Sequence, residues 1–159
     1  MFKVGDKVLH PLHGVGLIES MVEQEVLGES RKYFVLNLTM KRMTIMVPVT
    51  TAEEVGIRKL MNTSQIDEMM EVLKDRKMTK MPTNWNRRYK FNLDKIKTGD
   101  IKEVAEVMKN LSLKEQKKGL SMGEKKMLEN VRSLLVGEIV HSRNIDYGKA
   151  VKYIEEALH

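Results

Sequence analysis

The stretch GVGLIESMVEQEVLGESRKYFVLNL, residues 14–38, contains two runs rich in Val, Ile, Leu, Phe and Tyr that are separated by GES. These residue types favour strands, and a short turn signal between two such runs is typical of an antiparallel hairpin. Further apolar runs lie at residues 7–11 and 43–49. We therefore expect four or five short strands, and a flat sheet of that size cannot bury one face. The pattern predicts a strongly bent sheet or barrel.

Proline and glycine mark special positions in this predicted sheet. Pro48 stands near the end of the last run, and its missing N–H group favours an edge strand. The sheet should therefore keep at least one open edge. Gly14 and Gly16 suit a tight turn or a bulge, where a positive φ or a close backbone approach is needed.

From about residue 53 the apolar residues follow a helical period. Ile66, Met69, Met70 and Leu73 form one stripe. After Pro82 interrupts the pattern, a second helix is expected from about Trp85 to Lys97, with Thr83 or Asn84 as its cap. Caps at Asp100 and at the Ser121–Glu124 capping box start two more helices, and a short helix ends the chain.

The expected fold class is therefore α+β. We expect a small bent β module at residues 1–52, a connector at residues 53–62, and an all-α domain of about five helices at residues 63–159.

The composition narrows the range of functions. The chain has no cysteine, which excludes disulfides and thiolate metal sites. His10 and His13 flank Pro11 with no third ligand nearby, so we expect no metal. There is no glycine-rich phosphate motif and no nucleophile elbow. We expect no enzymatic activity, no cofactor and no small-molecule substrate. No window approaches the ~18 apolar residues of a membrane span, and we expect a cytoplasmic protein without a membrane partner.

The positive charge is concentrated in one segment. The whole chain has a net charge of +6, whereas residues 74–97 carry nine basic and two acidic side chains, a net charge of +7. A concentrated basic patch is typical of a protein with a polyanionic partner. The alternative is a solvated lysine-rich surface.

Trp85, the single tryptophan, lies within this basic segment. Trp85, Tyr89, Leu93 and Ile96 share one helical stripe, which favours a packed anchor. Trp85 is also at the first turn of its predicted helix, where cations and free N–H groups favour phosphate and a large ring suits the minor groove. The residues alone leave both interpretations open.

Longer blocks of sequence resemble a known family. FKVGDKVLHPLHGVGLIESM (residues 2–21), with YFVLNL and MTIMVPV after it, resembles the N-terminal module of the CarD/CdnL family of bacterial transcription regulators. The same module resembles the polymerase-interacting domain of the transcription-repair coupling factor. The later blocks PTNWNRRYKFNLDKIKTGD, KEVAEVMKNL and KGLSMGEKKMLENVRSLLVGEI are similar to the family's helical domain. The resemblance covers essentially the whole chain in the same order.

The resemblance implies two partners. A Tudor-like β module would add its sheet edge to a strand of the RNA polymerase β subunit. The helical domain would contact promoter DNA at the upstream edge of the melted region, where the family's tryptophan, matching Trp85, wedges into the minor groove and helps to hold the open complex. Relatives can carry arginines where this chain has Gln24 and Met46, so charge-assisted contacts at these positions do not carry over.

Ten residues are expected at these two contacts. The polymerase-binding residues are Gln24, Thr44, Ile45 and Met46, and the DNA-binding residues are Trp85, Arg87, Arg88, Lys90, Asn84 and Lys80.

The expected function is that of a transcription regulator whose DNA contact is largely independent of sequence. One alternative is a protein–protein interaction adaptor without direct DNA contact. Another is an RNA- or ribosome-binding factor of Tudor or SH3-like fold.

Overall fold

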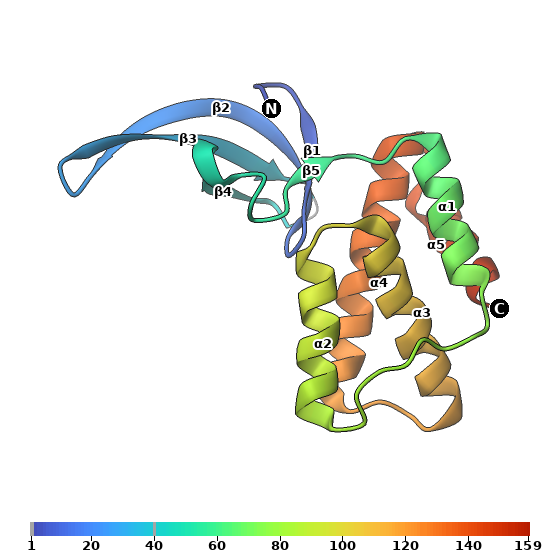
Figure 1. Cartoon of the computed structure of the whole chain (residues 1–159). Coiled ribbons are helices and arrows are strands. Elements are labelled where there is room, and N and C mark those ends of the chain that lie inside the picture. Colours follow the sequence, from blue (N-terminus) through green and yellow to red (C-terminus); the bar gives the residue numbers. More distant parts are fainter. Residues whose placement is uncertain (1, 40) are drawn as a thin grey trace.

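The computed structural model describes residues 2–39 and 41–159. Residues 1 and 40, which fall within the range expected for the β module, lie outside the described residues. The described residues form a five-stranded antiparallel sheet followed by five α-helices, which confirms the α+β fold class (Figure 1). In chain order the elements are β1 (Lys7–His10), β2 (Gly14–Val26), β3 (Glu29–Leu38), β4 (Met43–Pro48), the 3-10 helix η1 (Val49–Thr51), β5 (Arg58–Lys59), α1 (Thr63–Lys74), α2 (Trp85–Lys97), α3 (Ile101–Lys117), α4 (Met122–Arg143) and α5 (Tyr147–Leu158).

The strands lie in the order β4-β3-β2-β1-β5. β2 and β3 form a long curved hairpin that projects away from the helices (Figure 1). A two-residue turn closes this hairpin, and Leu27 and Gly28 both have positive φ, as the right-handed strand twist favours. A register shift between Ile18 and Ser20 adds to the bend. Among the described strands, β4 pairs only with β3, so Pro48 lies in an edge strand as predicted.

The bent sheet has a core of its own. Val8, Ile18, Phe34 and Leu36 pack with Val47 on one face of the sheet. Leu9 and Val15 face the other way and belong to the helical core instead. The start of the sheet therefore lies against the helices, while the end of the hairpin stays clear of them.

The helices begin where the sequence places their caps. Asn84 caps α2 by accepting a hydrogen bond from the Arg87 N–H, which decides between Thr83 and Asn84. Asp100 caps α3, and the capping box of Ser121 and Glu124 starts α4. The predicted stripe of α1 is buried in the helical core.

β5 lies inside the segment that was expected to be a connector. It pairs with β1, and this pairing brings Arg58 up to Glu138 on α4. Arg58 Nη1 and Nη2 lie 2.5 and 2.6 Å from the two carboxylate oxygens of Glu138, and Arg58 Nε donates to the Gly99 carbonyl. The Met61 N–H also donates to Glu138, whose side chain is only 1% exposed. A buried carboxylate with these partners holds the sheet in one place on the helices.

Two glycines allow the chain to cross itself beside this ion pair. Gly99 has φ +72°, and a Cβ built on it would lie 2.5 Å from the carbonyl oxygen of Gly56. Gly56 has φ +94°, and its Cβ would lie 2.8 Å from the carbonyl oxygen of Lys97. A side chain at either position would push the sheet and the helices apart.

Gly99→Ala is therefore expected to destabilise the protein more than Gly119→Ala does. Gly119 also has a positive φ, +80°, but nothing lies within 4 Å of its built Cβ. Both variants incur the backbone cost of about 1–2 kcal/mol, and only Gly99→Ala adds the clash with Gly56. Urea unfolding of the two variants measures the difference, and equal losses of unfolding free energy would contradict the close approach.

Candidate nucleic-acid interface

Trp85 is the first residue of α2, and its side chain is 45% exposed. Its ring stacks on Tyr89 of the next turn, with centroids 5.9 Å apart and an interplanar angle of 27°. The indole Nε1–H donates to Ser121 Oγ of the α4 capping box at 2.6 Å. The ring thus rests on the start of the apolar stripe and leaves nearly half of its surface to solvent.

A buried ion pair supports the serine that holds the indole. Ser121 Oγ donates to Glu124 Oε1 at 3.1 Å. Glu124 is 1% exposed and receives hydrogen bonds from Arg88 Nε at 2.8 Å and Nη2 at 3.1 Å. Arg88 Nη1 donates in turn to the carbonyl oxygen of Thr83, just before α2. Ser121 therefore links the indole ring to the ion pair of Arg88 and Glu124, which joins α2 to α4.

Both members of this pair stay charged. The hydrogen bond from Arg88 lowers the pKa of the Glu124 carboxyl below its ordinary 4.5, although burial acts in the opposite direction. The same hydrogen bond raises the pKa of the Arg88 guanidinium.

Arg88 differs from the other basic residues expected at the DNA contact in its burial. It was expected beside Arg87 and Lys90 as a DNA contact, and its side chain is buried. The physical reason is its place on α2, where it faces α4 and meets the buried carboxylate of Glu124. Arg88 therefore helps to position the start of α2.

The other expected residues of this group are exposed. Arg87 and Lys90 lie on α2, and Lys80 lies on the segment before it. Asn84 is exposed too, and its side-chain oxygen is occupied as the helix cap. The structure thus leaves Arg87, Lys90 and Lys80 as the exposed cations of the predicted set.

A second group of cations lies at the same end of the bundle, and it was not among the residues predicted from the sequence. Lys117 and Lys118 at the end of α3 and Lys125 and Lys126 in the first turns of α4 are exposed. A cavity of about 560 Å³ lies between part of this group and the segment that precedes α2, and its lining includes Lys80, Met81, Pro82, Lys114, Lys117 and Lys118. The sequence feature that could have predicted this group is the segment KEQKKGLSMGEKK, which contains five lysines and two glutamates.

The residues expected at the polymerase contact gather near the open edge. Thr44 and Met46 are exposed on β4, and Gln24 Nε2 lies 4.0 Å from Met46 Sδ. Ile45 is half-buried and packs on the core of the sheet. The structure therefore brings Gln24 and Met46 together on one face, while Ile45 faces the other way.

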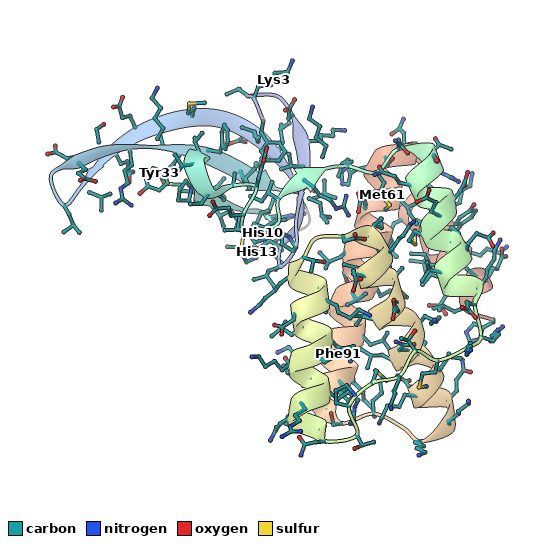
Figure 2. All side chains as sticks on the ribbon, viewed as in Figure 1. Lys3, His10, His13, Tyr33, Met61 and Phe91 are labelled. Atoms are coloured by element: carbon teal, nitrogen blue, oxygen red, sulfur yellow. The ribbon has the colours of Figure 1, made fainter. Side chains whose placement is uncertain are left out.

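His10 and His13 lie at the junction of the sheet and the helices, where their rings are 4.6 Å apart (Figure 2). Burial, with a smaller effect from His13, lowers the pKa of His10 to about 4. Lys41 Nζ lies 3.3 Å from His13 Nδ1. Within residues 2–39 and 41–159, no group of three or more His, Cys, Asp or Glu residues could hold a metal ion. In the part of the chain that the structure describes, none of the helices is both long and apolar enough for a membrane span.

Comparison with known proteins defines the family. Residues 68–155 match the family model of the CarD C-terminal domain, and residues 2–61 match that of the CarD-like/TRCF RID domain. The chain belongs to the CarD family. It is 36% identical over 139 residues to the Bacillus subtilis (strain 168) protein described as "Putative transcription factor YdeB", a match that covers 87% of this chain and 90% of that protein.

A solved structure also resembles the chain. It is the NMR structure of the 72-residue N-terminal domain of Myxococcus xanthus CarD, with 27% sequence identity and a TM-score of 0.32. The match covers 37% of this chain and 79% of that domain.

Glu124→Gln is expected to lower the free energy of unfolding by about 3–5 kcal/mol at neutral pH, because Arg88 stays buried without a charged partner. The folded-state pKa of Glu124 is depressed, so its contribution is complete above pH 4.5 and is lost as the pH falls through the folded-state value. The difference between wild type and Glu124→Gln should therefore shrink below pH 4.5.

The matched control is Glu129→Gln, an exposed position on the same helix. Urea unfolding at neutral and acidic pH measures all three proteins. A Glu124→Gln protein as stable as the control at neutral pH would contradict the role of the ion pair.

Proposed function

We propose that this protein is a non-enzymatic transcription regulator that binds the RNA polymerase β subunit and stabilises the open promoter complex in the cytoplasm. The β module would bind the polymerase, and residues 63–159 would contact DNA at the upstream edge of the bubble. The observation that carries the proposal is the exposed indole of Trp85, held by Tyr89 and Ser121 among exposed cations. Membership of the CarD family and the description of the relative as a transcription factor support it.

On the DNA side, Arg87, Lys90 and Lys80 would contact phosphates, and Trp85 would wedge into the minor groove at the edge of the bubble. Contacts of this kind depend on salt and on how easily a base step deforms, so the binding would be largely independent of sequence. The ring is already fixed through Ser121, so little conformational entropy is lost when it inserts.

On the polymerase side, β4 would pair with a strand of the β subunit. Strand addition gains affinity from backbone hydrogen bonds, which alternate residues along the open edge of β4 can supply. The exposed side chains of Gln24 and Met46 would add contacts beside that edge.

Trp85→Ala is expected to leave folding and polymerase binding intact and to shorten the lifetime of open complexes about tenfold. The reason is the loss of ring contact with a base step, which is worth about 1–3 kcal/mol. Tyr147→Ala on α5, which also removes an exposed ring, is the matched control. Decay of open complexes after addition of a competitor measures the lifetime. An unfolded Trp85→Ala protein, or one that gives wild-type lifetimes, would count against the proposal.

Met46→Glu is expected to weaken binding to the β subunit about tenfold, which corresponds to ~1.4 kcal/mol, because it places a charge beside the pairing edge. Met21→Glu is the control, since Met21 is an equally exposed methionine opposite Phe34 on the other face of the sheet. Pull-down with polymerase core and with the isolated β subunit measures both variants. If Met46→Glu binds like wild type, the contact does not lie at β4.

A further inference from the structure

Met122 is the first residue of α4, and its side chain is 83% exposed. In the sequence it lies between Ser121, the N-cap residue of α4, and Gly123. Ser121 accepts the Trp85 Nε1–H bond, and a Cβ built on Gly123 would lie 3.5 Å from Trp85 Cζ2. Met122 is therefore an exposed apolar side chain that directly follows the residue that holds the indole.

Folding gives no reason for an apolar residue at this position. The first turn of a helix favours acidic side chains, and large apolar side chains gain stability from burial that Met122 does not have. α2 and α4 begin at the same end of the bundle, the end away from the sheet (Figure 1). Each begins with a large exposed apolar residue, Trp85 in α2 and Met122 in α4.

The charges around this pair indicate what covers it. Arg87 and Lys90 lie in the first turns of α2, Lys125 and Lys126 lie in the first turns of α4, and all four are exposed. Two apolar side chains inside a group of cations are complementary to a ligand that is anionic outside and apolar inside. Duplex DNA has that character, since phosphates border the minor groove and stacked bases form its floor.

We propose that Met122 is a second wedge residue, which enters the minor groove together with Trp85 and packs against the same unstacked base step. The proposal rests on the proposed DNA contact of Trp85. Methionine is among the residues that proteins insert between base steps, and its unbranched side chain adapts to an irregular gap. Ser121 sets the spacing of the two wedges, because it holds the indole and directly precedes Met122.

The full-length protein tests this with a duplex that opens into a mismatched bubble and carries 2-aminopurine at the bubble edge. Met122→Ala is expected to keep the wild-type melting temperature, to weaken binding about three- to tenfold and to reduce the gain in 2-aminopurine fluorescence. Met122→Leu, which retains an apolar side chain, should bind like wild type. The salt dependence of Met122→Ala should keep its wild-type slope, whereas Lys90→Ala should lower that slope by about one phosphate contact.

Trp85→Ala in the same assay distinguishes a failure of the Met122 wedge from a failure of the DNA contact at Trp85. If Trp85→Ala weakens binding and Met122→Ala does not, the second wedge is overturned and the DNA contact of Trp85 stands. If neither variant weakens binding, the DNA contact at this end of the bundle is overturned as well. A third outcome also overturns the inference. If Met122→Ala weakens binding and also lowers the salt dependence of binding, the change has removed a phosphate contact and not a wedge.

Discussion

The ion pair between Arg58 and Glu138 fixes how the sheet lies on the helices. Glu138 is buried, and it accepts hydrogen bonds from both terminal nitrogens of Arg58 and from the Met61 N–H. Separating the two modules would leave this carboxylate without its partners in an apolar setting, which costs several kcal/mol. The close crossing of Gly56 and Gly99 lies in the same joint. The β4 edge and the Trp85 end of the bundle consequently belong to one body, and a partner bound at one end limits where the other end can reach.

α4 carries a second buried carboxylate that works in the same way. Glu124 fixes the start of α2 through Arg88, as Glu138 fixes the sheet through Arg58. Buried ion pairs add little net stability compared with apolar packing, but breaking one is costly, so they select one arrangement over its alternatives. Each pair joins α4 to a segment distant in the chain.

Local signals in the sequence predicted much of this structure. The helix from Trp85 to Lys97 and the capping box of Ser121 and Glu124 depend on residues within one turn of each other, and both are present. The two-residue strand β5 is too short to show a period of its own. It forms because β1 offers a partner, so pattern alone placed it in a connector.

The pairing of Arg88 with Glu124 was not predicted, and the cause is distance along the chain. Its partner Glu124 lies 36 residues away, beyond the reach of any helical period. One local signal did exist, since Arg88 and Asn92 border the apolar stripe of α2 and both are buried. The lysines of α3 and α4 were missed for the same reason, because the fold brings them to the Trp85 end from a separate segment.

The two buried glutamates of α4, Glu124 and Glu138, fix both a distance along the helix and a rotation about its axis. They are 14 residues apart, which corresponds to about 21 Å along the axis and places both on nearly the same face. Adding or removing one residue between them would change the length by only about 1.5 Å but turn one carboxylate about 100° away from its arginine. The span between the two ends of the molecule therefore cannot drift gradually during evolution. It can change only in steps close to whole helical turns, which restore the facing of both ion pairs.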